Sequence, residues 1–158
     1  MMYRIAIRDI SQGDFERIVE LNAAAVPHTS AMDALRLQEL QTMANCNWVI
    51  AVDGVVAGFL LAMRERAGYA NPNYDFFAAR YPVFLYIDRI VIAPEQAGLK
   101  RGTRLYEALD GRSEMAGLVR RTSHTGGHRF APTVLSFPDG YAWAHVDGPY
   151  LGRQLGAG

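Results

Sequence analysis

The apolar positions at the start of the chain follow two different repeats. Residues 3–8 (YRIAIR) alternate between large apolar and polar or small side chains, which is typical of a half-buried strand. Ser11, with Asp14 three residues later, resembles the capping box that begins a helix. Apolar residues then recur at helical spacing across Phe15–Val26, and Pro27 ends the run. A strand followed by a helix is therefore predicted.

Ser30 and Asp33 repeat the start signal of a helix. The side chains expected to form the apolar stripe of this second helix are Met32, Leu35, Leu40 and Met43. Leu37 lies outside that stripe.

Two β-rich runs follow, Trp48–Val52 and Val55–Met63, joined by Asp53-Gly54. Asp-Gly between apolar runs is among the strongest signals for a hairpin. The stretch 64–82 is rich in aromatic residues and is expected to be irregular, with Asn71-Pro72 marking a turn.

Phe84–Ile92 is a nearly continuous apolar strand, interrupted by Asp88-Arg89 and closed by Pro94. Gly98 and Gly102 then lead into a helix whose apolar residues are Leu105, Tyr106 and Leu109. Beyond Asp110-Gly111 the chain becomes polar and glycine-rich. A second hairpin is predicted there from Thr133–Phe137 and Tyr141–Val146.

Composition narrows the classes of function. Lys+Arg and Asp+Glu are equal at 16, so charge gives no reason to expect nucleic acid or an anionic membrane as a partner. Cys46 is the one cysteine, which excludes an intrachain disulfide and a zinc site built from cysteines. The N-terminus does not read as a signal peptide, and no apolar stretch reaches the ~20 residues of a membrane span. A cytoplasmic location is expected.

The turn before the last helix has the chemistry of an anion site. Amides at the start of a helix lack intrahelical partners, and the helix dipole adds partial positive charge there. Glycine allows the backbone to approach a pyrophosphate closely, and Lys100 and Arg101 supply positive charge. The alternative is that Gly98 and Gly102 merely shape a turn, since glycine spacing alone is weak evidence.

The order of the predicted elements and the segment Leu85–Tyr106 (LYIDRIVIAPEQAGLKRGTRLY) together resemble the GNAT superfamily of N-acetyltransferases. The signature turn of that superfamily reads Gln/Arg-x-x-Gly-x-Gly/Ala after its fourth strand. The resemblance covers about residues 3–110, and its phrase FLYIDRIVIAP is fairly specific. It implies an α/β (α+β) fold, with a mixed, mostly antiparallel sheet and helices on both faces. Residues 1–117 would form the acetyl-CoA-binding core and 118–158 an atypical C-terminal part whose hairpin packs on the same sheet.

The resemblance further implies transfer of an acetyl group from acetyl-CoA, as co-substrate and without a metal, to a primary amine of a small molecule or protein. Many such proteins are dimers, so a homodimer is one expected assembly. The turn amides would hold the pyrophosphate, and the strand backbone would pair with pantetheine. The residues expected to bind the cofactor are Ile90, Val91, Ile92, Ala97, Gly98, Leu99, Lys100, Arg101, Gly102 and Thr103.

The turn departs from the signature at two positions. Ala97 stands where Gln or Arg is expected, and Lys100 stands where the first glycine of the pair is expected. A non-catalytic, degenerate CoA-binding domain, or a fusion product, therefore stays open as the alternative function.

Transfer to an amine needs a base, and the resemblance makes Asp88, on the fourth strand, the nearest candidate. Its alternative role is that of a partner for the adjacent Arg89. In the superfamily the general acid is usually a tyrosine on the helix that follows the fifth strand. No such helix can be recognised in this sequence after residue 117, so no acid is assigned.

An acceptor pocket is expected beside the aromatic stretch. The residues proposed to line it are Asn22, Tyr74, Phe77 and Tyr81. For the aromatic side chains among them, packing in the core is the alternative.

Residues 122–147 (TSHTGGHRFAPTVLSFPDGYAWAHVD) resemble a different family, the thioredoxin-like or sucrase/ferredoxin-like ferredoxins. There His124 and His128 would help two cysteines hold an iron–sulfur cluster. Cys46 is the sole thiol of this chain, so such a site cannot be completed. A redox or metal-binding module built around this tail is the third hypothesis.

Overall fold

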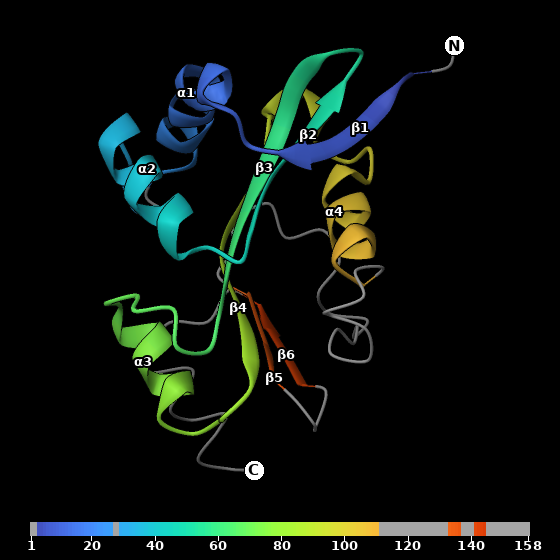
Figure 1. Cartoon of the computed structure of the whole chain (residues 1–158). Helices are drawn as coiled ribbons and strands as arrows, with labels where there is room; N and C mark the ends of the chain where they lie inside the picture. Colours follow the sequence, from blue (N-terminus) through green and yellow to red (C-terminus); the bar gives the residue numbers. More distant parts are fainter. Residues whose placement is uncertain (1–2, 27–28, 111–132, 137–140, 145–158) are drawn as a thin grey trace.

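The computed structural model describes residues 3–26, 29–110, 133–136 and 141–144. Its strands form one sheet in sequence order, and every pairing between described strands is antiparallel (Figure 1). The strands are β1 (Ile5–Asp9), β2 (Cys46–Val52), β3 (Val55–Arg64), β4 (Phe84–Ile92), β5 (Thr133–Ser136) and β6 (Tyr141–Ala144). The helices are α1 (Phe15–Ala25), α2 (Ala34–Met43), α3 (Pro72–Ala78) and α4 (Arg101–Asp110), with single 3-10 turns at Gln12–Asp14 and Pro94–Gln96.

The helices cover both faces of the sheet, as the α/β assignment requires. Helices α1, α2 and α3 lie on one face and α4 on the other (Figure 1). Each face has its own apolar core. Ile18, Leu37 and Phe59 belong to the first core, which we call the α1 face, and Ile50, Ile90 and Leu105 to the second, the α4 face. The central strands β2, β3 and β4 are therefore buried on both sides, which explains why they are apolar at nearly every position.

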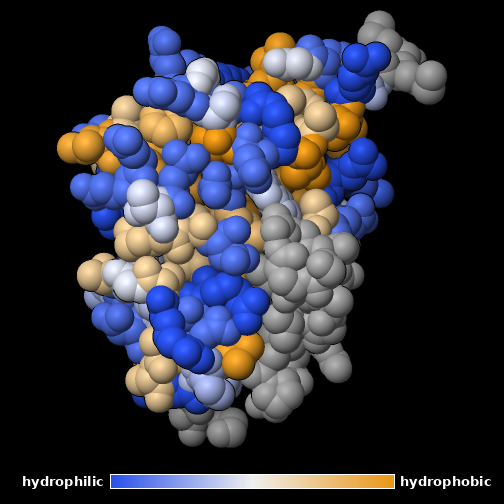
Figure 2. All heavy atoms as spheres, viewed as in Figure 1, coloured by the Kyte–Doolittle hydropathy of each residue, from blue (hydrophilic) through white to orange (hydrophobic). Residues whose placement is uncertain are grey.

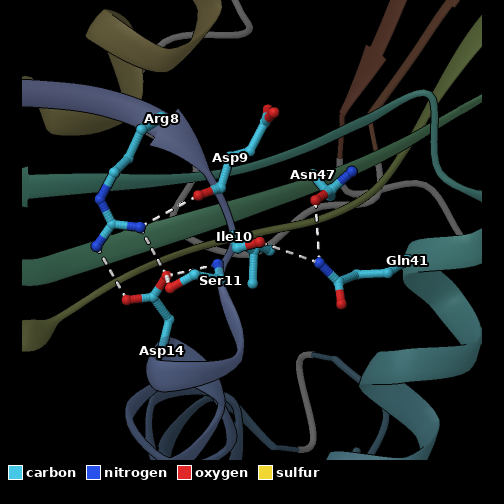
Figure 3. Close-up of polar contacts among 7 residues, drawn as sticks. All are labelled: Arg8, Asp9, Ile10, Ser11, Asp14, Gln41 and Asn47. Carbon is cyan, nitrogen blue, oxygen red and sulfur yellow. Dashed lines mark hydrogen bonds and ion pairs between the residues drawn. The ribbon is translucent and has the colours of Figure 1, made fainter.

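The predicted capping signal lies at the corner between β1 and α1 (Figure 3). The Ser11 amide donates to the Asp14 carboxylate at 2.8 Å, and both terminal nitrogens of Arg8 donate to the same carboxylate, at 2.7 and 3.0 Å. These hydrogen bonds, with that of Arg8 foremost, lower the pKa of Asp14 to about 2. Gln41 ties α2 to the same corner by donating to the backbone oxygen of Ile10 and to Asn47.

The hairpin predicted at Asp53-Gly54 is confirmed. Both residues have positive φ, 51° and 83°, as the tight two-residue turn that joins twisted strands requires. The Asp53 side chain accepts a hydrogen bond from the amide of Arg4 at 2.8 Å, which ties this turn to the start of the chain.

The expectation that residues 64–82 are irregular is wrong for part of that stretch, because α3 occupies Pro72–Ala78. Asn71 is its N-cap, and its side-chain oxygen accepts from the amides of Asn73 and Tyr74. Pro72 stands at the first helical position, where its missing N–H costs nothing. The pair that was interpreted as a turn is therefore a helix start.

The predicted apolar stripe of α2 is also wrong in detail. Leu37 and Leu40 are fully buried, whereas Leu35 is 66% exposed. Leu37 and Leu40 are three residues apart and share one face of the helix, while Leu35, two positions before Leu37, points away from it.

The C-terminal hairpin extends the sheet. β5 pairs with the first four residues of β4, from Phe84↔Ser136 to Ile87↔Thr133, and β6 pairs with β5. The proposed division at residue 117 falls outside the described residues and stays a prediction.

The surface in Figure 2 is covered largely by hydrophilic side chains, with hydrophobic ones gathered in smaller groups between them. Among the described residues, none of the helices has the length and apolar character that crossing a membrane requires.

Candidate functional site

β4 contains a bulge at its two charged residues. On β3, Leu61 stands opposite Arg89 and the next residue, Ala62, opposite Ile87, so Asp88 has no counterpart. An extra residue in one strand bends it and shifts its alternation by one position. Leu85, Ile87, Ile90 and Ile92 accordingly all belong to the α4 face, and the side chains of Asp88 and Arg89 both contact residues on the other side of the sheet.

Beyond the bulge, one edge of β4 lies beside no other strand that the structure describes. On the side away from β3 it pairs with β5 from Phe84 to Ile87. Within the part of the chain that the structure describes, no strand continues this pairing along residues 88–92. Backbone groups on such an edge can hydrogen-bond an extended ligand.

The glycine turn lies next to that edge. A Cβ atom added at Gly102 would lie 4.0 Å from side-chain atoms of both Ile90 and Ile92, so the first turn of α4 packs directly on β4. Gly98 and Lys100 both have positive φ, 80° and 62°. The turn therefore uses the left-handed conformation at two positions before α4 begins.

The basic residues of the turn differ in their positions. Lys100 is exposed, so its ammonium lies at the surface beside the start of α4. Arg101 is 8% exposed; its Nε donates to the Gln96 side chain at 3.0 Å and its guanidinium lies 5.9 Å from the Tyr3 ring centre. Of the two, Lys100 is thus the residue placed to meet a phosphate from solvent.

Asp88 is buried in a polar cluster on the α1 face. It accepts from the Tyr69 hydroxyl at 2.5 Å and from Arg89 Nε at 2.7 Å. Arg89 also donates to the Asn22 side chain at 3.0 Å and to the backbone and hydroxyl oxygens of Ser30, at 3.1 and 3.0 Å. Both Asp88 oxygens are therefore already hydrogen-bonded, and the Arg89 contact foreseen as the alternative is present.

Tyrosines around this cluster stay protonated at neutral pH. Burial, and then the negative charge of Asp88, raise the pKa of Tyr69, and the same two causes raise the pKa of Tyr86. The Tyr69 phenol therefore acts as a hydrogen-bond donor to Asp88.

The residues expected to line an acceptor pocket lie mostly inside the core. Asn22 is fully buried and donates to the Ser30 carbonyl at 2.9 Å. Tyr74 and Phe77 are 4% and 0% exposed, and Tyr81 is partly buried and stacks on Phe77. Their observed contacts are those of core residues, and their role in binding an acceptor stays a prediction.

A surface pocket of about 580 Å³ opens instead between α1 and α2. It is lined by Val19, Ala23, Val26, Ala31, Met32, Asp33 and Arg36. Sequence reasoning named Arg89 as a partner of Asp88 but missed two other polar contacts of this cluster. The contact of Tyr69 with Asp88 spans 19 positions and that of Ser30 with Arg89 spans 59, separations that no local pattern reveals.

His124 and His128 lie outside the described residues. Within those residues there is no group of His, Cys, Asp and Glu that could hold a metal ion.

A comparison with known families gives a match over most of the chain. The model of a family described as the acetyltransferase (GNAT) family matches residues 5–130. The match continues past residue 110, where the resemblance was expected to end, and overlaps the first part of the 122–147 segment. Searches of curated proteins and of solved structures found no match. The likeness of residues 122–147 to ferredoxins gains no support from these comparisons.

Proposed function

Because the chain belongs to the acetyltransferase (GNAT) family, we propose that it transfers the acetyl group of acetyl-CoA to a primary amine of a small molecule or protein. One observation supports this most strongly. The edge of β4 that carries Ile90–Ile92 has no described strand beside it, and the glycine turn at the start of α4 packs against the same residues.

In this proposal the turn binds the pyrophosphate of the cofactor. The amides of Arg101 and Gly102, in the first turn of α4, have no intrahelical acceptor, and the helix dipole favours an anion there. Exposed Lys100 adds a charge-assisted contact. The edge of β4 at residues 90–92, which has no described strand beside it, would pair with the pantetheine arm and polarise the thioester carbonyl.

The chemical step is attack of the amine nitrogen on the thioester carbon. The new C–N bond forms as the C–S bond breaks, CoA leaves as a thiolate, and the amine loses a proton to a base. We propose Asp88 as that base. A carboxylate offers about four lone-pair sites, and Tyr69 and Arg89 occupy one on each oxygen.

A non-catalytic CoA-binding domain is the second candidate. It is favoured by Ala97 and Lys100 in the turn and by the hydrogen bond that each oxygen of Asp88 already accepts in the buried cluster.

Two measurements separate these functions. Acetyl-CoA at about 100 times its Kd should stabilise the native state by about 2.7 kcal/mol, seen as a rise in Tm. Release of free CoA thiol with a panel of amines then detects catalysis. A Tm rise without thiol release favours the second candidate. No Tm rise at millimolar acetyl-CoA would overturn both.

The role of Lys100 has a matched control within the chain. Lys100 and Arg66 are both exposed basic residues with positive φ, 62° and 61°. Lys100→Ala should weaken acetyl-CoA binding, with a smaller dependence of affinity on salt, whereas Arg66→Ala should leave both unchanged. Equal effects of the two substitutions would contradict the placement of a phosphate at Lys100.

A further inference from the structure

We propose that Arg89 is a positioning residue, which holds the connection between α1 and α2 against the β4 bulge and so fixes the acceptor amine relative to the thioester. This inference rests on the proposed acetyltransferase function. It assigns to Arg89 and Ser30 a role in acceptor binding that is separate from cofactor binding.

The bulge is what brings Arg89 to the α1 face. In a regular strand, consecutive side chains point to opposite faces, so Asp88 and Arg89 would lie on different sides of the sheet. Here both contact residues of the α1 face. The carboxylate therefore neutralises the guanidinium locally, with a contact of 2.7 Å between side chains that are each at most 5% exposed.

A buried ion pair of this kind is seldom explained by stability. Replacing such a pair by apolar residues of similar volume is often neutral or stabilising, because desolvation offsets the attraction. The cluster does, however, determine geometry. Arg89 is 3% exposed, yet it reaches outward to both the carbonyl and the hydroxyl of Ser30, an exposed residue.

Hydrogen bonds from two side chains hold Ser30 in the connection between α1 and α2. The Ser30 carbonyl accepts from Arg89 and from Asn22, and the preceding residue, Thr29, has a long backbone hydrogen bond of 3.4 Å to Ala25. Ala31, Met32 and Asp33 follow directly and line the pocket between α1 and α2. A shift at Ser30 would therefore move one wall of that pocket.

The position of the proposed base indicates which side the amine comes from. Asp88 faces the α1 side of the sheet, so an amine that gives its proton to Asp88 approaches from the side on which Ser30 lies. The turn at Lys100 and the packing of Gly102 belong to the other face of β4, on α4. Loss of the Arg89–Ser30 contacts should thus affect the acceptor and leave the cofactor bound as before.

The test uses Arg89→Lys and Ser30→Ala in the full chain. Lysine keeps the charge beside Asp88 but cannot reproduce the forked donors of arginine, and Ser30→Ala removes the hydroxyl partner of Arg89 at an exposed site. Thr42→Ala is the control, because it removes another exposed hydroxyl that makes one hydrogen bond, here donated to the backbone oxygen of Glu39 on α2 and unconnected to Arg89.

Both variants should raise the acceptor KM about tenfold, the effect of losing a hydrogen bond to a charged group, with the acetyl-CoA-induced Tm shift close to that of the parent. In Ser30→Ala, which leaves the hydrogen bonds of Asp88 in place, kcat should also stay close to that of the parent. Hydrogen–deuterium exchange should rise in the segment 29–33 of both variants and stay unchanged in Thr42→Ala. An unchanged acceptor KM, or an equal loss of acetyl-CoA affinity, would overturn the inference.

If the parent protein acetylates none of the amines tested, the proposed function fails by itself. The exchange measurement then decides on the positioning role alone. Unchanged exchange at 29–33 in Arg89→Lys would overturn that role as well.

Discussion

Asp14→Asn should destabilise the protein by an amount that depends on pH. The Asp14 carboxylate accepts hydrogen bonds from both terminal nitrogens of Arg8 and from the amide and hydroxyl of Ser11 (Figure 3). Its pKa falls from 3.8 to about 2 in the folded protein. At ~1.36 kcal/mol per pKa unit, this shift corresponds to at most about 2.5 kcal/mol of stability. The Arg8 side chain is 44% exposed, and solvent screening weakens such pairs, so we expect about 1–2 kcal/mol at pH 7.

The sign of the pH dependence follows from the direction of the shift. A carboxyl group whose pKa is lowered by folding contributes its full stabilisation when the pH is above its pKa in the unfolded chain. That contribution to the free energy of unfolding is lost as the pH falls through its pKa in the folded protein. The difference in unfolding free energy between the parent and Asp14→Asn should therefore be constant from pH 7 to about pH 5. This difference in unfolding free energy should shrink between about pH 4 and pH 2.

Urea unfolding followed by circular dichroism, at pH 7, 5, 3.5 and 2.5, measures this difference directly. Asp9→Asn is the control, because exposed Asp9 contributes its backbone oxygen to the same corner. Comparing variants at each pH cancels general acid destabilisation. A gap equally large at pH 7 and pH 2.5, or an Asp9 variant that behaves like the Asp14 variant, would refute the reasoning.

Four further substitutions test the packing and the helix start, by urea unfolding at pH 7. Gly58→Ala should cost about 1–3 kcal/mol, because the added Cβ would lie 2.7 Å from the backbone oxygen of Val91; a neutral result would mean that β3 and β4 separate easily. Asn71→Ala should cost about 1 kcal/mol through loss of the α3 cap, with faster amide exchange in α3, and unchanged exchange would contradict the capping role. Leu37→Ala should cost about 2–5 kcal/mol while Leu35→Ala stays within about 0.5 kcal/mol, and the opposite order would mean that α2 is rotated.

Sequence reasoning located the central strands well because their signals are local. The hairpin between β2 and β3 depends on Asp53-Gly54, and the end of β4 on Pro94, so neighbouring residues suffice to predict them. The Asn71-Pro72 signal was also local but ambiguous, since the same pair can begin a turn or a helix. What decided between them was the burial of Tyr74 and Phe77, which form the buried face of α3 and whose burial depends on the tertiary structure.

The candidate site was predictable in part for the same reason. The glycine turn and its following helix have a continuous pattern, and the family model supports the assignment that this pattern suggested. The cluster around Asp88 could not be predicted, because Arg89 and Asn22 are 67 positions apart. The β4 bulge was hidden as well, since a strand that is apolar on both faces has no visible alternation to interrupt.

The bulge also determines which changes of length this strand can accept. Phe84 and Tyr86 lie in the first core, and Ile90 and Ile92 in the second, although all four occupy even-numbered positions. Deleting one residue at Asp88 would remove the bulge and leave a regular strand in which Phe84 and Tyr86 still face the first core and Ile90 and Ile92 the second. A related sequence that lacks one residue here should therefore keep both apolar layers and lose only the pair of neighbouring charged side chains on the α1 face.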